Sequence, residues 1–204
     1  MRFFQIPKWS RIIYSDAIWD FFLKKNNTIY LTFDDGPCVQ STQWILDLLS
    51  KYNAKATFFC LGKNVQHQPA LFEEIRKQGH SIGNHGMQHL DGFKSSIEEY
   101  LADVSEASKR IHSSLFRPAY GRIKKSQYTA LKRQGFQIVF WSLLTYDFDS
   151  SFTTEKRLEI IRKKTKAGSI LVFHDSEKAF PQLQNELPVL MEEWVKAGFK
   201  FAAI

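Results

Sequence analysis

The stretch Thr28-Ile29-Tyr30-Leu31-Thr32-Phe33, followed by Asp34-Asp35-Gly36-Pro37, decides the fold of this chain. Its β-branched, aromatic and aliphatic residues are typical of a buried strand. The Gly-Pro pair after the two aspartates is a turn signal, and it would let both carboxylates serve one site. A solvated Asp-Gly turn is the alternative interpretation. A strand that ends in carboxylates is typical of a sheet whose functional groups gather at the carboxyl ends of its strands.

Short apolar runs and longer stretches of helical period alternate over the rest of the chain. The sequence predicts strands over residues 28–33, 56–60, 81–84, 115–117, 137–141, 169–174 and 200–203. It predicts helices over residues 41–52, 69–78, 95–113, 125–135, 154–164 and 183–197. This alternation indicates a parallel sheet, and no glycine-rich phosphate loop follows the first strand, which argues against a dinucleotide fold. The expected fold is a distorted (β/α)7 barrel with outer helices.

Residues 1–27 precede this alternation, and we expect them to form an N-terminal extension that packs on a barrel domain of residues 28–204. Four residues of the extension recur at helical spacing: Trp9, Ile13, Ala17 and Phe21. This spacing predicts an amphipathic helix that caps the barrel. Peripheral contact with a membrane surface is the alternative, and Asp16 and Asp20 count against it.

The charge pattern bears on the kind of partner. The chain has 204 residues, of which 44% are hydrophobic, and a net charge of +7. This composition indicates a globular protein and excludes disorder. The basic residues are scattered, and the one dense cluster, at residues 162–166, ends a predicted helix, where cations complement the helix dipole. We therefore expect no nucleic-acid partner.

Cysteine content and apolar runs bear on the location of the protein. The two cysteines, Cys38 and Cys60, form no Cys-x-x-Cys motif, which fits a reducing compartment. The longest apolar runs are far shorter than the ~20 residues of a membrane span, and no signal peptide is recognised. We expect a cytoplasmic monomer, with membrane association or export as the alternative location.

Several predicted strands end in residues capable of metal or acid–base chemistry. His85 and His89 follow the third strand and are four residues apart, which places them on one face if the segment begins a helix. Surface histidines are the alternative. With a carboxylate from another strand end, they would form a two-histidine, one-carboxylate metal site that leaves positions open for water and substrate.

Arg117 and His174 lie at two further strand ends. A guanidinium keeps its charge at physiological pH and can keep a neighbouring aspartate ionised, whereas a surface salt bridge is the alternative role of Arg117. His174 ends the most hydrophobic strand. Its position at the strand end favours general acid or base work over the role of a structural core histidine.

Four motifs occur in the chain in this order: Thr32-Phe33-Asp34-Asp35-Gly36-Pro37, His85-x-x-x-His89, Arg117-Pro118-x-Tyr120-Gly121 and Leu171-Val172-Phe173-His174-Asp175. Their order and spacing resemble the polysaccharide deacetylase family, also called the NodB-homology domain or carbohydrate esterase family 4. The resemblance spans about residues 28–204. It implies a distorted β/α barrel and a hydrolase of linear amides other than peptide bonds. Such an enzyme would release acetate from N-acetylated carbohydrates, such as oligo- or polysaccharides that contain N-acetylglucosamine.

The resemblance also implies a metal site and a base. Asp35, His85 and His89 would bind zinc, with cobalt or another divalent transition metal as the alternative. Asp34 would be the general base for a water molecule. Arg117 would orient Asp34 and keep it ionised.

The resemblance implies an acid and a substrate pocket as well. His174 would protonate the leaving amine, and Asp147 would hold His174 in its protonated form. The backbone N–H of Tyr120 would face the developing oxyanion. Phe148 and Val172 would line the acetyl pocket.

The motifs depart from the family pattern at several positions. Gly86 stands where Ser or Thr is usual, Ala119 replaces a second proline, and Leu144 stands where aspartate is common. None of these changes removes a metal ligand, the base or the acid. They leave one alternative open, which is a catalytically weak carbohydrate-binding relative of the same fold.

Overall fold

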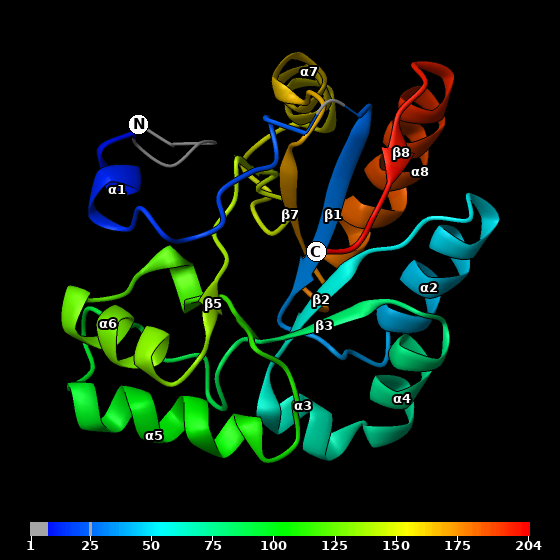
Figure 1. Ribbon diagram of the computed structural model, residues 1–204. Coiled ribbons are helices and arrows are strands. Elements are labelled where there is room, and N and C mark those ends of the chain that lie inside the picture. Colours follow the sequence, from blue (N-terminus) through cyan, green and yellow to red (C-terminus); the bar gives the residue numbers. More distant parts are fainter. Residues whose placement is uncertain (1–7, 25) are drawn as a thin grey trace.

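The computed structural model describes residues 8–24 and 26–204, without the side chains of residues 8 and 9. A strongly curved sheet lies at its centre, and helices pack around it (Figure 1). The strands are β1 (Thr28–Asp34), β2 (Thr57–Cys60), β3 (Ser81–Asn84), β4 (Leu115–Phe116), β5 (Gln137–Ile138), β6 (Leu143–Leu144), β7 (Ile170–His174) and β8 (Lys200–Phe201). The helices are α1 (Lys8–Ile13), α2 (Thr42–Lys51), α3 (Gly62–His67), α4 (Pro69–Lys77), α5 (Ile97–Ser108), α6 (Lys125–Arg133), α7 (Thr154–Lys164) and α8 (Phe180–Lys196), with a 3-10 turn η1 (Ala119–Gly121).

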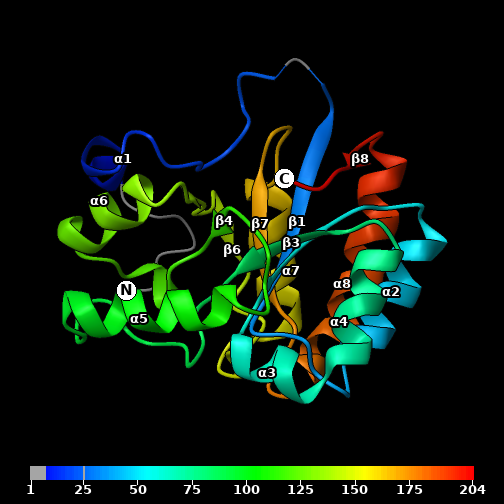
Figure 2. The same ribbon diagram turned by 60° about the horizontal axis from the view of Figure 1, so that its bottom comes forward.

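Seven strands follow the order β5-β4-β3-β2-β1-β7-β6, and each neighbouring pair is parallel. Figure 2 shows this sheet from a second direction, with helices on its outer side. The expected distorted (β/α)7 barrel is therefore confirmed. Because all carboxyl ends of parallel strands meet at one edge, the loops after β1, β3, β4 and β7 share the same face of the barrel.

The central strand, β1, is buried along its whole length, and its side chains alternate between two environments. Ile29, Leu31 and Phe33 pack in the large cluster that includes apolar residues of α2 and α8. Tyr30 belongs to a separate cluster with interior residues of neighbouring strands. The two-residue period of a strand therefore turns Asp34 toward the barrel interior, on the same side as Tyr30.

The seventh strand of the barrel differs from the prediction. Residues 200–203 were expected to supply it, but β8 is only two residues long and pairs with Thr28 and Ile29 at the amino end of β1, outside the barrel order. The missing position is taken by β6, which the sequence did not predict. It is too short to show a period, and the side chains that flank it, Ser142 and Thr145, bond to carbonyl oxygens of β7.

The N-terminal segment lies beside the opening between β5 and β6. Ile18 forms a parallel bridge with Val139, just after β5, and the Phe21 N–H donates to the Gly168 carbonyl, just before β7. The predicted helix through Phe21 is therefore wrong beyond Ile13, because the segment pairs its backbone with the sheet instead. The predicted role of the Trp9 side chain lies outside the described residues.

Several helices differ from the prediction, and α5 ends at Ser108, five residues before its predicted end at residue 113. The six residues of α3 were not predicted, because a helix so short shows little more than one period. α8 begins at Phe180, three residues before the predicted start at residue 183, and it has Pro181 in its first turn. Proline is well tolerated there because the N–H it lacks would have no intrahelical partner.

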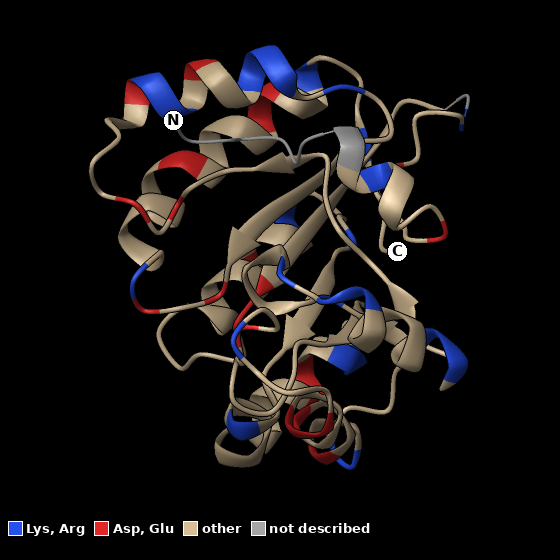
Figure 3. Ribbon diagram, turned by 90° about the vertical axis from the view of Figure 1, so that its left-hand side faces the viewer, with Lys and Arg blue, Asp and Glu red and all other residues tan. Residues whose placement is uncertain are grey.

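Charged residues occur on several helices and loops, with acidic and basic residues interspersed (Figure 3). The basic end of α7 contains Arg162, which forms an exposed ion pair with Glu193. This is the solvated helix end that the sequence predicted. Among the described residues, no helix is long and apolar enough to cross a membrane.

Candidate active site

The loop after β1 brings two carboxylates together. Asp34 is the last residue of β1, and at Asp35 the backbone turns, with a φ of 79°. The Asn64 side chain fixes this turn by donating to the Asp35 carbonyl at 2.6 Å. At Gly36 any side chain would collide with the buried Asp175 carboxylate. The sequence-based expectation that the chain turns after Asp34 is therefore confirmed.

The segment from His85 to His89 is a loop, so helical spacing is not what brings the two histidines together. The backbone N–H groups of Met87 and Gln88 donate to the Asp103 carboxylate at 2.8 and 2.9 Å, which leaves them unavailable for helical bonds. The two imidazole rings nevertheless meet, with centroids 5.1 Å apart. Asp103, on α5, is a structural residue of the site that the motifs did not reveal.

Three ligand atoms converge at this point. Asp35 Oδ1 lies 3.6 Å from His85 Nε2 and 3.3 Å from His89 Nε2, and all three atoms lie within 4.8 Å of one another. Asp35 Oδ1 is buried and makes no hydrogen bond within the described chain, although buried carboxylate oxygens are normally bonded. Two imidazoles and one carboxylate are a donor set that suits a divalent transition metal such as zinc.

The environment of His85 prepares it for such a role. Its Nδ1 lies 2.7 Å from the Arg117 carbonyl oxygen, so Nδ1 carries the proton and Nε2 presents its lone pair toward Asp35. Burial, reinforced by the charge of His89, lowers the pKa of His85 to about 3 against the opposing effect of Asp35. The imidazole is therefore neutral, as a metal ligand must be.

Arg117 lies behind the two carboxylates and is fully buried. It donates to Asp34 Oδ1 at 2.7 Å and to Thr32 Oγ1 at 2.6 Å. Its other nitrogens donate to the carbonyl oxygens of Val139 and Phe140. Burial lowers the pKa of Arg117 while Asp34 opposes that effect, and a guanidinium keeps its charge under these conditions. The alternative of a surface salt bridge is wrong, because both partners are inside the barrel.

His174 faces the same site from β7. The register between β1 and β7 pairs Asp34 with His174. Asp147 holds His174 with both carboxylate oxygens, one on the backbone N–H and one on Nδ1, each at 2.7 Å. Burial alone would lower the pKa of His174, but the charge and hydrogen bond of Asp147, with the charges of Asp35 and Asp34, raise it to about 9.

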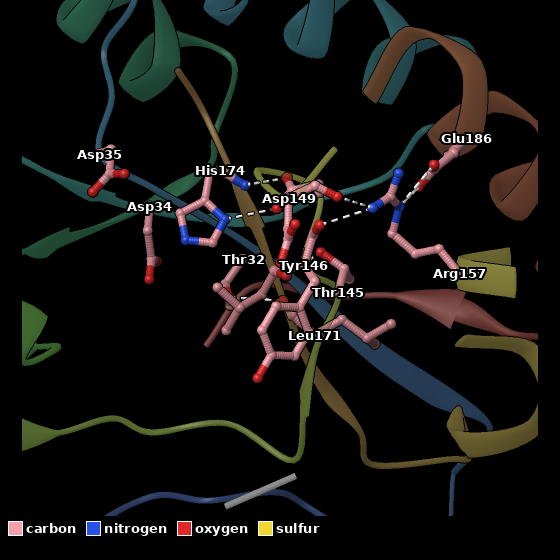
Figure 4. A network of polar contacts seen from close by, with 12 residues as sticks. Thr32, Asp34, Asp35, Thr145, Tyr146, Asp149, Arg157, Leu171, His174 and Glu186 are labelled. Atoms are coloured by element: carbon pink, nitrogen blue, oxygen red, sulfur yellow. Dashed lines mark hydrogen bonds and ion pairs between the residues drawn. The ribbon is translucent and has the colours of Figure 1, made fainter. Parts of the chain in front are cut away.

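The loop that carries Asp147 is fixed by a buried ion pair that sequence reasoning missed (Figure 4). Arg157 donates to both carboxylate oxygens of Glu186 at 2.8 and 2.9 Å, and both side chains are 1% exposed. The same guanidinium donates to the carbonyl oxygens of Tyr146 and Asp149, on either side of Asp147. In the sequence, Arg157 is indistinguishable from the solvated cations of α7.

A cavity of about 430 Å³ joins these groups. Its lining includes the carboxylate pair, the three histidines of the motifs and the remaining predicted pocket residues, namely Tyr120, Phe148 and Val172. Tyr120 has a φ of 58° and places its ring 4.5 Å from the ring of His89. Phe148 packs edge-on against His174 at 4.8 Å. Arg117 and Asp147 are not part of the lining, but they are hydrogen-bonded to Asp34 and His174, which are.

The cavity also contains Leu144, one of the positions that depart from the family pattern, and residues that the motifs did not single out for its lining, among them Trp141 and Lys178. The Trp141 indole N–H is buried and has no acceptor within the described chain. A buried indole N–H normally has a partner, so this donor is available to a ligand. Trp141 is the last residue of the predicted strand over residues 137–141, but the sequence gave no indication that its indole N–H would lack a partner.

Comparison with known proteins places this site in a family. The family model described as polysaccharide deacetylase matches residues 24–139. A peptidoglycan-N-acetylglucosamine deacetylase of Bacillus cereus is 35% identical over 86% of this chain and 85% of its own length. The peptidoglycan-N-acetylmuramic acid deacetylase PdaA of Bacillus subtilis is 33% identical over 88% of this chain and 71% of its own length.

The solved structures agree with this assignment. The crystal structure of the Bc1960 peptidoglycan N-acetylglucosamine deacetylase superposes with a TM-score of 0.89 and 26% identity, over 98% of this chain and 95% of that one. The chain therefore belongs to the polysaccharide deacetylase family, a family of amide-hydrolysing enzymes, and the resemblance noted in its motifs is confirmed.

Proposed function

We propose that this protein hydrolyses the acetamide group of N-acetylated sugars, with Asp34 as general base and His174 as general acid. One observation carries the proposal. The register of β1 with β7 places these two groups side by side at the cavity, next to the converging ligand atoms of Asp35, His85 and His89. Hydrolysis of an amide needs an activated water, a stabilised oxyanion and a proton for the nitrogen, so the base and the acid must both reach one cavity.

Asp35, His85 and His89 would hold a divalent metal ion, with zinc as the first candidate and cobalt or another transition metal as the alternative. Asp35 Oδ1, which lacks a hydrogen bond within the described chain, and the neutral His85 support this assignment. An ion bound there would polarise the amide carbonyl and make water a stronger nucleophile at neutral pH.

Asp34 would take the proton from the attacking water. Its Oδ1 is occupied by Arg117, which leaves Oδ2, 4.0 Å from His85 Nε2, to face the reacting group. Because Arg117 cannot lose its charge and is fixed by four hydrogen bonds, it would hold Asp34 in one orientation through the reaction. Arg117 is thus a positioning residue.

His174 would give a proton to the leaving nitrogen. Asp147 occupies its Nδ1, so Nε2 is the atom that delivers the proton. A pKa of about 9 means that the imidazole is protonated at neutral pH, as an acid must be. The backbone N–H of Tyr120 would stabilise the oxyanion, and Phe148 and Val172 would enclose the acetyl methyl group.

The substrate class follows the relatives, two of which are named for N-acetylglucosamine and N-acetylmuramic acid in peptidoglycan. Peptidoglycan lies outside the bacterial cytoplasm, so such a substrate would require export, and the cytoplasmic location expected from the sequence is not confirmed. The monomeric state also stays a prediction.

We also propose that residues 1–27 form an extension packed on a catalytic domain of residues 28–204. The stacking of Trp19 on Phe140, with ring centroids 4.2 Å apart, and the bridge from Ile18 to Val139 support this division. Membrane contact by the extension stays a prediction.

The proposal is tested by acetate release from N-acetylglucosamine oligomers, with zinc added in equal amount to the protein. Asp34→Asn should reduce kcat by about 10² to 10⁴-fold, whereas Asp47→Asn, at an exposed position on α2, should leave it unchanged. Glycan binding without acetate release by the wild-type protein would instead support the carbohydrate-binding alternative.

A further inference from the structure

A second cavity, of about 610 Å³, lies on the other side of the proposed metal ligands. It shares Asp35, His89 and Ser176 with the catalytic cavity, so the two meet at the proposed metal ligands. Its far walls come from the loop between β1 and α2 and from α3. Its volume is within the ~300–1,000 Å³ that is typical of ligand sites.

The two cavities differ in chemistry. The catalytic cavity has the aromatic rings of Tyr120, Trp141 and Phe148, which offer flat apolar faces to a sugar ring. The residues that line the second cavity include no Phe, Tyr or Trp and instead present amide, imidazole, carboxylate and ammonium groups. The second cavity is therefore better suited to a polar, acyclic group attached to the sugar than to another ring.

Lys63 is the one lysine or arginine of the second cavity's described lining. It is half-buried at the start of α3, where its backbone N–H donates to the Met87 carbonyl. Its ammonium group has no hydrogen-bond or ion-pair partner among the described residues. An ammonium group without a partner in the chain is free to bind an anionic ligand.

The acidic residues of the cavity do not fill this role. The carboxylate of Asp175 is buried and accepts hydrogen bonds from the hydroxyls of Ser41 and Thr42 at 2.5 and 2.6 Å. Glu177 is exposed and accepts from Gln40 at 2.8 Å. The third, Asp35, belongs to the proposed metal site. None of the three acidic residues pairs with Lys63, so its ammonium group is available to a ligand from outside the chain.

We propose that the second cavity binds a carboxylate-bearing substituent of the substrate glycan and that Lys63 is the cation that recognises it. This inference rests on the proposed function and narrows its substrate to acidic N-acetylated glycans. The carboxylate has two sources in such glycans, the lactyl ether of N-acetylmuramic acid and an acidic peptide attached to that ether. Both present the same group to an ammonium ion.

The test compares kcat/KM for acetate release from three substrates, in wild-type protein and in Lys63→Gln, Lys63→Arg and Lys77→Gln. The substrates are a neutral N-acetylglucosamine oligomer, an oligomer that contains N-acetylmuramic acid without peptide, and the same oligomer with an acidic peptide. The wild-type protein should prefer an acidic substrate, and Lys63→Gln should lower the acidic-to-neutral ratio about tenfold, mainly through KM. Lys63→Arg should keep most of the ratio, and the exposed Lys77→Gln should not change it.

The pattern across substrates distinguishes the sources of the carboxylate. If the wild-type protein already prefers the N-acetylmuramic acid oligomer without peptide over the neutral oligomer, Lys63 binds the lactyl carboxylate. If it prefers only the oligomer with peptide, Lys63 binds a carboxylate of the peptide. An unchanged ratio in Lys63→Gln overturns the proposal. If no substrate releases acetate, the proposed function is contradicted instead. Calorimetry then measures the binding of the acidic and neutral oligomers to Asp34→Asn and to Asp34→Asn/Lys63→Gln. Weaker binding of the acidic oligomer alone in the double variant shows that Lys63 recognises the carboxylate, and equal binding overturns this.

Discussion

Replacement of Asp147 by asparagine tests the proposed acid most sharply. In the folded protein the charge and hydrogen bond of Asp147 are the largest influences that raise the pKa of His174, which reaches about 9 against an ordinary value of 6.5. That difference corresponds to roughly 3 kcal/mol in favour of the imidazolium. Burial acts in the opposite direction, so without the Asp147 charge we expect the pKa of His174 to fall by about two or more.

The sign of the effect follows from the role of His174. The wild-type protein has its acid protonated up to a pH of about 9, so its activity should fall only above that pH. In Asp147→Asn the fall should begin near pH 7 or lower. The assay is the pH profile of kcat from pH 5 to 10, and NMR titration of the His174 ring nitrogens reports the same change directly.

Glu159→Gln is the matched control, because Glu159 is an exposed acid on α7. Its profile should match the wild type. An alkaline limb of Asp147→Asn that coincides with the wild type would refute the assignment of Asp147 as the residue that keeps His174 protonated. A loss of kcat that is equal at all pH values would also refute it, because that pattern indicates lost geometry rather than a changed pKa.

Three further substitutions test residues that shape the proposed active site. Glu186→Ala leaves the buried guanidinium of Arg157 unpaired and should lower the free energy of unfolding by about 3–5 kcal/mol in urea titration; a loss below 1 kcal/mol would contradict a structural role for the pair. Trp141→Phe keeps an aromatic ring, although a smaller one, and removes the unpaired indole N–H, so it should raise KM several-fold; an unaltered KM would show that no substrate atom uses this donor. Gly36→Ala forces a methyl group against Asp175 and should abolish zinc binding or folding, whereas a fully active variant would show that this turn can relax.

The alternation of short apolar runs with helical stretches was enough to predict the barrel, because each period reports which face of an element is buried. The two-residue period of β1 places Asp34 and Tyr30 on the side of the strand that faces the barrel interior, where Arg117 also lies. The β1 register then set Asp34 beside His174, which the sequence implied only through family resemblance.

Other parts of the site had no local signal. The His85 loop takes its shape from Asp103, a contact between residues far apart in the chain. β6 is held by hydrogen bonds of Thr145 to β7 rather than by its own propensity. The burial of Arg157 depends on Glu186 in another helix, and a single sequence does not reveal such a pairing.

Zinc binding to the metal-free protein tests the central claim most directly. Isothermal titration should give one equivalent of zinc per chain, and the affinity should fall at least a hundredfold in His89→Ala and Asp35→Asn but not in Asp47→Asn. Binding that persists unchanged in both site variants, or no binding by the wild-type protein at all, would contradict a metal-dependent deacetylase built on Asp35, His85 and His89.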